Sequence, residues 1–406
     1  MKDTLVVTAV TMPVSCAIRR AAYVAEMKTS RTITTVAPFL FGAVAWTVPS
    51  AAETFDAKGV LIEAEIVNQE LEHPWGLDFL PGGEAIVTER PGRIRILNAS
   101  GLSNPVDGVP KVAARGQGGL LDIVAAPDFA QSGLIFFSYS EPGSGGAGTA
   151  VARAKLVRDG GGARLEDVKT IFSMAKKTGT SHHFGSRLVF HPDGTLFVTT
   201  GDRGDGRRAQ DMQDSAGGVL RINPDGSAPK DNPSEDGSKM LPELWSKGHR
   251  NVQGAAYDPV LGGVITVEHG AMGGDEVNRP EAGKNYGWPV ITYGVNYNGD
   301  KIGVGTAADG YEQPLFYWDP SIAPSGLASY QGDMFPEWKG DLLVGSLKFA
   351  LLSRLDRDAS GKITGEERLL EGAFGRIRDV NVAPDGSIWL LTDEDDGAIV
   401  RLSRAD

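Results

Sequence analysis

The sequence predicts an all-β fold, a six-bladed β-propeller with four-stranded antiparallel blades. Two observations lead to this prediction: one turn-and-strand unit recurs six times along the chain, and helical periodicity is nearly absent after residue 53. In addition, the 53 glycines and 23 prolines are spread along the chain, which is typical of many short strands joined by tight turns. We therefore expect a repeat architecture.

The repeated unit is a turn of proline, glycine and aspartate followed by a β-branched or aromatic run. It is clearest where Pro192-Asp193-Gly194 precedes the run from 195 to 199. Proline presets one backbone angle, aspartate bonds the local backbone and glycine permits a positive φ, so the unit marks a hairpin before an inner strand. Spacings of roughly 45 to 75 residues fit four-stranded blades with inserted loops. The units begin at Pro81, Pro127, Pro192, Pro259, Pro336 and Pro384.

A β-sandwich, or a pair of them, is the alternative fold. It would account for short strands but not for one unit repeated six times, so we favour the propeller. In a propeller the inner strands converge on an axial channel, and loops at one mouth bring distant residues together. We therefore expect a scattered site, with one or two residues from each blade.

Length and charge limit the classes of partner. A chain of 406 residues with 41% hydrophobic residues can bury one large core, and all-β folds of this length often form a single domain. The formal net charge of −12 disfavours nucleic acids and anionic membranes, because both are polyanionic. Cys16 is the only cysteine, so we expect no disulfide framework and no thiolate metal cluster.

Residues 1–52 are expected to be an N-terminal extension and secretory signal, and residues 53–406 a single β-propeller catalytic domain. Met27 is followed by basic residues, an apolar run from 32 to 48 and small residues at 50–52. This pattern is typical of a cleaved signal, and we expect Met27 to be the true start. A membrane anchor is the alternative, but the run is short and contains proline. We therefore expect export to the periplasm, without stable membrane insertion of the mature chain.

Polar residues are concentrated in a few segments that we place at strand ends. Five of the pocket candidates are basic or imidazole side chains, although the net charge is strongly negative. Such a pocket suits an anion with several carboxylates or phosphates. The segments are 116–121, 181–187, 248–254 and 375–379, and Lys348 adds a fifth position.

Arg376 and Arg378 are two residues apart. On an extended strand they would share one face and could hold neighbouring carboxylates bidentately. Spacing alone favours the alternative, a solvated strand face whose arginines pair with Asp379 or Glu371.

Arg250 and Asn251 form a second polar group, flanked by His249 and Gln253. Four hydrogen-bonding side chains in five positions rarely serve packing, so this segment is a candidate binding site. Arg187 precedes an apolar run, and we expect it to make a structural ion pair.

His183 is the candidate general base. A neutral imidazole near its own pKa can accept a proton from a hydroxyl while a partner orients it. Asp202 lies nineteen residues further on, after a predicted strand, and a hairpin could return it to the histidine. The pair His182-His183 is ambiguous on its own, and we interpret His73 and His191 as structural.

The stretch from Glu268 to Asn278 mixes glycines, acids and an amide. Its backbone carbonyls and carboxylates could hold calcium, which takes oxygen ligands. It lacks the spaced acids of an EF-hand loop, and a glycine-rich loop is more often only a loop.

These segments, in this order, resemble the soluble glucose and aldose sugar dehydrogenases that depend on pyrroloquinoline quinone (PQQ), the glucose/sorbosone dehydrogenase family. The similarity runs from His73-Pro74-Trp75-Gly76 to Asp393. By this resemblance His183 is the catalytic base that takes the proton of the sugar C1 hydroxyl as hydride moves to the quinone C5. Asp202 orients it, and Arg250 stabilises negative charge on the cofactor.

The resemblance also implies both cofactors, PQQ and calcium. Gly270 and Ala271 match the pair whose backbone carbonyls bind the calcium that bridges to PQQ. The segment Asn285–Pro289 is a further signature, which we interpret as structural. The positions that contact PQQ in the family fall on Gln117, His183, Arg250, Asn251, Lys348, Arg376 and Arg378.

Two departures from the glucose dehydrogenases are similar to the aldose branch. His182 stands where they have an aspartate, and Ala271 stands where they have a proline. The expected activity is therefore oxidation of aldoses at the C1 hydroxyl to the lactone, with electrons passed to an external acceptor. The oligomeric state stays open.

Two other functions are possible on such a fold, which by itself does not decide function. A calcium-dependent sugar lactonase would require carboxylates around its metal, and the arginines would have little function in it. A non-catalytic binding propeller predicts loss of the histidine and arginines, which this chain retains.

Overall fold

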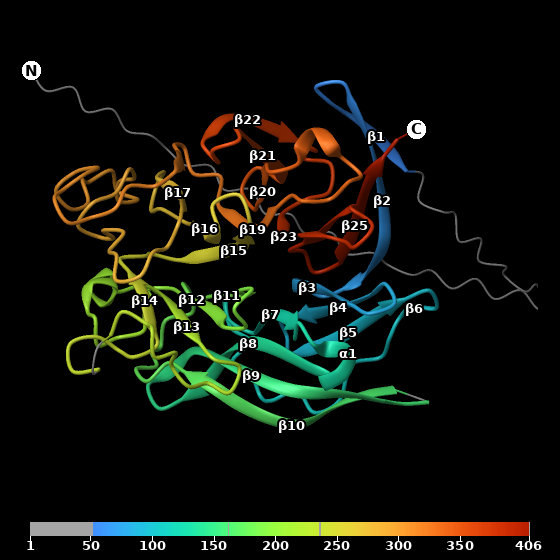
Figure 1. Cartoon of the computed structure of the whole chain (residues 1–406), viewed down its shortest axis with the longest axis horizontal. Coiled ribbons are helices and arrows are strands. Elements are labelled where there is room, and N and C mark those ends of the chain that lie inside the picture. The colour runs from blue at the N-terminus through green and yellow to red at the C-terminus, as the bar shows by residue number, and fades with distance from the viewer. Residues whose placement is uncertain (1–51, 161, 235–236, 406) are drawn as a thin grey trace, which may run out of the picture. The chain divides into compact units, whose positions relative to one another are not determined.

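The computed structural model describes residues 52–160, 162–234 and 237–405. Within these ranges the chain forms six antiparallel sheets arranged as a six-bladed β-propeller, as predicted (Figure 1). The expected signal segment, with Met27 and Cys16, lies outside the described residues. None of the helices in the described part of the chain is long and apolar enough to cross a membrane.

In each of the first five sheets the innermost strand comes first in the chain, and the following strands lie one after another toward the outside. The first three sheets contain β3 (Pro74–Leu80), β4 (Glu84–Glu89), β5 (Arg93–Asn98) and β6 (Gly101–Leu102); β7 (Leu120–Ala125), β8 (Leu134–Gly143), β9 (Gly146–Asp159) and β10 (Gly162–Ser173); β11 (Gly185–Phe190), β12 (Leu196–Thr200), β13 (Gly218–Ile222) and β14 (Leu244–Lys247). The next two contain β15 (Val252–Asp258), β16 (Gly263–Glu268), β17 (Asp275–Asn278) and β18 (Phe316–Trp318); β19 (Pro324–Ser329), β20 (Leu342–Ser346), β21 (Leu351–Arg357) and β22 (Ile363–Leu369).

The sixth sheet joins the two ends of the propeller and differs from the prediction in having five strands. Its order is β1 (Glu53–Ala57), β2 (Val60–Leu71), β25 (Gly397–Arg404), β24 (Ile388–Thr392) and β23 (Ile377–Val382). Pairing of β2 with β25 closes the ring by hydrogen bonds between distant parts of the chain. The extra strand β1 forms a hairpin with β2, because Ala57 pairs with Val60 across a two-residue turn.

The six predicted turns occupy one equivalent place, the link between the first and second strand of each sheet. Short helices accompany two of these links, α1 (Phe129–Ser132) and η2 (Pro336–Trp338), and a third helix, η1 (Gly206–Gln210), follows β12. In the turn after β11, Asp193 Oδ1 accepts from the backbone nitrogen of Thr195 at 2.9 Å, and Gly194 has φ of 87°. The turn chemistry inferred from sequence is therefore the chemistry that starts the second strand.

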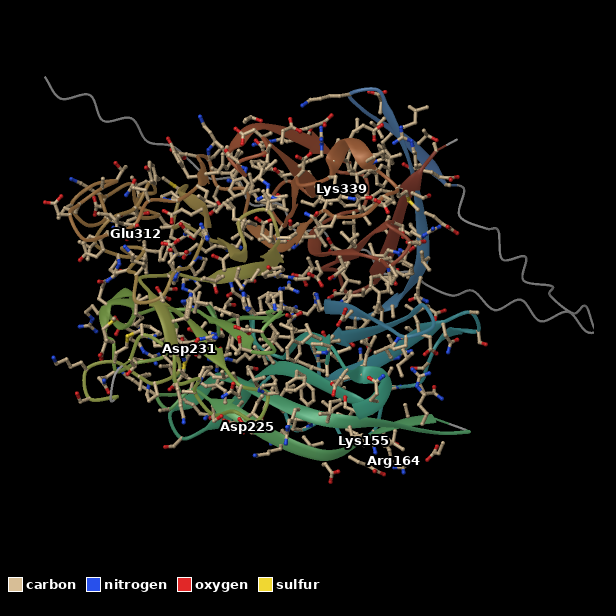
Figure 2. All side chains as sticks on the ribbon, in the orientation of Figure 1. Lys155, Arg164, Asp225, Asp231, Glu312 and Lys339 are labelled. Carbon is tan, nitrogen blue, oxygen red and sulfur yellow. The ribbon has the colours of Figure 1, made fainter. Side chains whose placement is uncertain are left out.

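Apolar side chains fill the gaps between sheets rather than one central core. Six clusters of buried hydrophobic residues each lie between two neighbouring sheets. Strands such as β12 and β20 are buried along their whole length because both faces meet a neighbouring sheet. Lys155 on β9 and Arg164 on the edge strand β10 lie instead in the outer half of the second sheet (Figure 2).

The innermost strands meet at a buried ion-pair cluster. Arg187 Nη1, from β11, lies 2.8 Å from Asp122 Oδ1 on β7 and 2.8 Å from Asp379 Oδ1 on β23. The other carboxylate oxygens accept from backbone N–H groups of β11 and β3. Gly76 and Gly326 leave room for this cluster, since an added Cβ would lie 2.6 Å from Asp122 Oδ1 or 2.5 Å from Asp379 Oδ1. Arg187 therefore has the structural role predicted for it.

Replacing Arg187 by methionine should destabilise the fold strongly, because two buried carboxylates would lose their shared cation. Breaking a buried pair of this kind costs about 3–5 kcal/mol of unfolding free energy, which urea denaturation would measure. Arg158→Met is the control: Arg158 pairs with Glu84 but its side chain is 43% exposed, and such a pair is worth less than about 1 kcal/mol. Equal losses in the two variants would contradict this account of the axis.

Candidate active site

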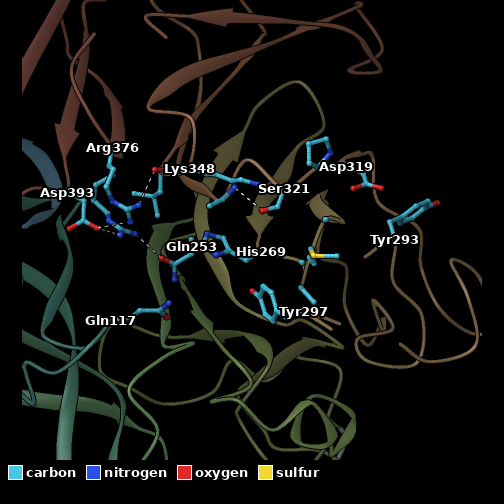
Figure 3. Close-up of a pocket in the computed structure, with 18 of the residues that line it drawn as sticks. Gln117, Gln253, His269, Tyr293, Tyr297, Asp319, Ser321, Lys348, Arg376 and Asp393 are labelled. Carbon is cyan, nitrogen blue, oxygen red and sulfur yellow. Dashed lines mark hydrogen bonds and ion pairs between the residues drawn. The ribbon is translucent and has the colours of Figure 1, made fainter. Parts of the chain in front are cut away.

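A cavity of about 930 Å³ reaches the axis at the mouth formed by the links between second and third strands. Trp75, Gln253 and Arg378, from innermost strands, contribute to its walls. Figure 3 shows Arg376 and Asp393 at one end of the cavity and Tyr293 and Asp319 at the other. The site is assembled from distant segments, as the propeller prediction requires.

The cavity wall is strongly basic. It carries four cationic side chains, against the carboxylates of Asp319 and Asp393. Burial alone would raise the pKa of Asp393, but Arg378 and Arg90 hold it well below the usual range, so this carboxylate stays ionised. Asp393 is engaged by Arg378 and by His73, whose Nδ1 lies 2.9 Å from Asp393 Oδ1. The four cations are Arg90, Lys348, Arg376 and Arg378.

Arg376 and Arg378 both line the cavity but are held differently. Arg378 is buried and donates to Gln253 Oε1 at 3.0 Å and to Asp393. Arg376 is 48% exposed and donates to the Leu347 carbonyl at 3.1 Å. The alternative partners considered from spacing, Asp379 and Glu371, are wrong. Asp379 belongs to the axial cluster, and the hairpin of β24 and β23 brings Asp393 to the arginines instead.

His183 and Asp202 form a hydrogen-bonded pair in which the carboxylate is buried and the imidazole is half-buried. His183 Nδ1 lies 2.6 Å from Asp202 Oδ1, and their side chains are 12% and 1% exposed. The pairing of β11 with β12 returns Asp202 to the histidine, as expected. His183 has φ of 58° and its backbone N–H donates to Gln117 Oε1 at 2.7 Å. Such a backbone is unfavourable for a residue other than glycine, by about 1 kcal/mol or more, and marks a constrained position.

The electrostatic surroundings keep His183 neutral and Asp202 ionised. Burial lowers the pKa of His183, and the Arg250 guanidinium lowers it further, while Asp202 acts in the opposite direction. The pKa of Asp202 is lowered because hydrogen bonds from His183 and its neighbours outweigh burial. With Nδ1 engaged by Asp202, Nε2 is the ring nitrogen that remains for accepting a proton.

Arg250 and Asn251 lie in the link between β14 and β15, beside this pair. The Arg250 carbonyl accepts from the Asp202 backbone nitrogen at 2.9 Å, and the Arg250 guanidinium donates to the His269 carbonyl at 3.3 Å. Asn251 Oδ1 accepts from the Gly185 backbone nitrogen at 3.2 Å. Both residues are buried.

The predicted site residues therefore fall into two groups that adjoin each other. Contacts through Gln117, Gln253 and His269 connect them, because these cavity residues touch His183, Asn251 and Arg250 respectively. The first group lines the cavity and comprises Gln117, Gly270, Ala271, Lys348, Arg376 and Arg378. The second lies at its border and comprises His183, Asp202, Arg250 and Asn251.

Gly270 and Ala271 lie in the loop from β16 to β17 and line the cavity. The Gly270 N–H donates to Asp275 Oδ1 at 2.9 Å, which ties the loop to the start of β17. Within the described residues, no group of three or more His, Cys, Asp or Glu side chains is placed to hold a metal ion. A cation bound in this loop would therefore be coordinated by backbone carbonyls and by oxygens of the molecule that occupies the cavity.

Several cavity residues were missed from sequence, notably Arg90, His269 and Asp319. Arg90 directly follows β4 and His269 directly follows β16, in the place that Asp393 takes after β24. Aligning the six repeats on their turns would have singled out this position. Asp319 follows the outermost strand β18, where the repeat offers no such signal.

The fold and the site define a class of protein: a propeller with a cation-lined axial cavity beside a hydrogen-bonded histidine–carboxylate pair. The chain belongs to the Glucose / Sorbosone dehydrogenase family, whose match covers residues 71–401. This confirms the resemblance inferred from the motifs and places the chain among sugar dehydrogenases.

Relatives and solved structures agree with that assignment. Aldose sugar dehydrogenase YliI of Escherichia coli (strain K12) is 44% identical over 353 residues, which are 84% of this chain and 93% of the relative. Quinoprotein glucose dehydrogenase B of Acinetobacter calcoaceticus is 28% identical over 429 residues, covering 84% and 89%. The apo-form of the soluble aldose sugar dehydrogenase from Escherichia coli matches with a TM-score of 0.81 and 43% identity, covering 85% and 100%. The PQQ-bound form of the Streptomyces coelicolor aldose sugar dehydrogenase matches with 0.71 and 28%, covering 84% and 98%.

Replacing Asp202 by asparagine should lower the pKa of His183 further, because Asp202 is the charge that opposes burial. The pKa can be followed by ¹⁵N NMR titration of the unliganded protein. Asp205→Asn is the control, since Asp205 pairs with Arg207 in the same link but does not contact His183. An unchanged or raised pKa of His183 in Asp202→Asn would contradict the pairing described here.

Proposed function

We propose that this chain is a quinoprotein that oxidises aldoses at the C1 hydroxyl to the lactone, with PQQ and calcium as cofactors and an external electron acceptor. Family membership and the PQQ-bound relative support the sugar and the quinone. The roles of individual residues rest on the geometry of the cavity and of the His183–Asp202 pair.

The observation that carries the proposal is the basic wall of the cavity. Within the described residues, Arg90, Lys348, Arg376 and Arg378 line the cavity against two carboxylates, and one of these, Asp393, is already engaged by Arg378 and His73. Positive charge gathered in a cavity favours an anionic ligand, and arginines hold carboxylates by charge-assisted hydrogen bonds. PQQ is a planar tricarboxylate and fits this set of cations. Arg376, Arg378 and Lys348 would hold its carboxylates, with Gln117 and Asn251 donating to its oxygens.

Calcium fits the same cavity. Gly270 and Ala271 would supply backbone carbonyls, the kind of oxygen ligand that calcium takes, and PQQ oxygens would complete the coordination. Such a site needs no cluster of acidic side chains, in agreement with the composition of the wall. Calcium bound there would act as a Lewis acid toward the quinone.

The residues of this chain would accept the proton of the substrate hydroxyl and stabilise the negative charge that develops. When bound, PQQ supplies a two-electron acceptor for the hydride that leaves C1 of the sugar. His183 Nε2 accepts the proton of the C1 hydroxyl, and Asp202 holds the ring in the tautomer with hydrogen on Nδ1. Arg250 lies close enough to depress the pKa of His183 and would stabilise negative charge that develops on the oxygens nearby.

The lactonase alternative is disfavoured by the composition of the cavity. A hydrolase of that kind would need a cluster of carboxylates to bind its metal, whereas the described cavity offers Asp319 and Asp393, and Asp393 is already engaged by Arg378 and His73. The four cationic side chains of the cavity wall would have no function in a lactonase. Export of the enzyme to the periplasm completes the proposal and rests on the sequence of residues 1–52.

Dye-linked oxidation of an aldose panel tests the proposal. We expect activity only when PQQ and calcium are both added to the apoprotein, and a loss of about 10²–10⁴-fold in kcat for His183→Ala, the usual contribution of a general base. The matched control is His191→Ala, because His191 lies at the opposite end of β11. Activity without PQQ, or a His183→Ala variant as active as the control, would refute the proposed chemistry.

Arg376→Ala should weaken binding of PQQ by about tenfold or more, because a charge-assisted hydrogen bond to a carboxylate is worth at least about 1.5 kcal/mol. Titration of apoprotein with PQQ at saturating calcium, followed by absorbance, would measure the Kd. Arg368→Ala is the control, since Arg368 is similarly exposed and pairs with Glu366 outside the cavity. A Kd equal to that of the control would remove Arg376 from the cofactor site.

A further inference from the structure

Trp288 contacts both Asp202 and Arg250, the two residues that flank His183 in the candidate active site. It lies in the long link between β17 and β18, within the segment interpreted from sequence as structural. Its indole Nε1 donates to Asp202 Oδ2 at 2.8 Å, and its ring lies 5.3 Å from the Arg250 guanidinium. A residue from a link of the fourth sheet thus contacts the carboxylate that pairs with His183 and the guanidinium that lies beside it.

The indole completes the hydrogen bonding of Asp202. Oδ1 accepts from His183 Nδ1 at 2.6 Å and from the Gly204 backbone nitrogen at 2.7 Å, which leaves Oδ2 for Trp288. With both oxygens engaged, the carboxylate plane cannot rotate without losing a bond. Its orientation decides which nitrogen of His183 carries the hydrogen.

Trp288 is itself held from several directions. Its backbone nitrogen donates to the Gly248 carbonyl at 2.9 Å, and its carbonyl accepts from Gln210 Nε2 at 2.7 Å. Gly206 leaves space for the ring, since an added Cβ would lie 3.1 Å from the indole Nε1. Trp288 is therefore held by contacts from the η1 helix and from the link after β14, in addition to its bond to Asp202.

We propose that Trp288 is a positioning residue, which fixes Asp202 and Arg250 so that His183 presents Nε2 as the acceptor of the substrate proton. The proposal rests on the proposed function, because only in that function does His183 act as a base. Trp288 acts through Asp202 and Arg250.

The test replaces Trp288 by phenylalanine, which retains a ring beside Arg250 but removes the indole donor. Asp202 Oδ2 then loses the bond that stabilises its charge, and an imidazolium partner becomes more favourable. The pKa of His183 should therefore rise by about one unit. The charged and titratable groups around His183 are Asp202, Arg250, His182 and His269, and the substitution changes none of them.

Trp318→Phe is the matched control. Trp318 Nε1 also donates to a carboxylate, Glu366 Oε1 at 2.9 Å, but between the outermost strands β18 and β22. NMR titration of the histidines in the protein without PQQ should show the shift of His183 in Trp288→Phe and not in Trp318→Phe. In the loaded enzyme the acid limb of kcat/KM should move to higher pH by the same amount. Equal pKa values of His183 in the two variants would overturn the proposal.

A measurement on the native chain covers the case in which Trp288→Phe does not fold. The indole N–H signal of Trp288 should shift with pH at the pKa of His183, because the two share Asp202, whereas the signal of Trp318 should not. A Trp288 signal that stays constant through the titration of His183 would overturn the proposal. These titrations use protein without PQQ, so a failure of the proposed activity would leave their outcome unchanged.

Discussion

The ring of sheets converges on one buried cation, Arg187. Asp122 and Asp379 bind it from sheets on either side of the axis, and its Nε donates to the Gln253 carbonyl at 3.2 Å. A buried arginine must be paired to be tolerated, so the inner strands are held in one relative position. Gln253 also accepts from Arg378 through Oε1. Gln253 and Arg378, which line the cavity, are therefore connected directly to the cluster that joins the inner strands.

This arrangement explains how an acidic protein presents a basic pocket. The net charge of −12 reflects the whole sequence, while the cavity gathers Arg90, Lys348, Arg376 and Arg378 from different sheets. The Trp75 ring lies near two buried guanidiniums, 4.5 Å from that of Arg187 and 5.8 Å from that of Arg378. One carboxylate, Asp393, is held in common by Arg378 and His73. The remaining positive charge faces the cavity and favours an anionic ligand.

Much of the fold could be predicted because it repeats. The Pro-Asp-Gly turn occurs in full at Pro192 and Pro384, and related units that begin with proline occur at the other four links, so local sequence marked the equivalent link in all six sheets. The pairing of His183 with Asp202 was also predictable, since one hairpin separates them. The fifth strand of the closing sheet was not, because β1 pairs through a short hairpin that carries no repeat signal.

The rest of the site depends on contacts between sheets, which spacing along the chain does not encode. Arg378 on β23 meets Gln253 on β15 because the innermost strands of two sheets converge at the axis. Trp288 reaches Asp202 from a link of another sheet. The resemblance to a family supplied candidate residues, and the structure adds the distances, burial and partners that give each a physical role.

A crystal structure of the chain with PQQ and calcium tests the central claim most directly. The account predicts PQQ in the axial cavity, with carboxylate oxygens about 3 Å from side-chain nitrogens of Lys348, Arg376 or Arg378, and calcium on the carbonyls of Gly270 and Ala271. PQQ bound elsewhere, or bound in the cavity with its carboxylates away from these cations, would contradict it.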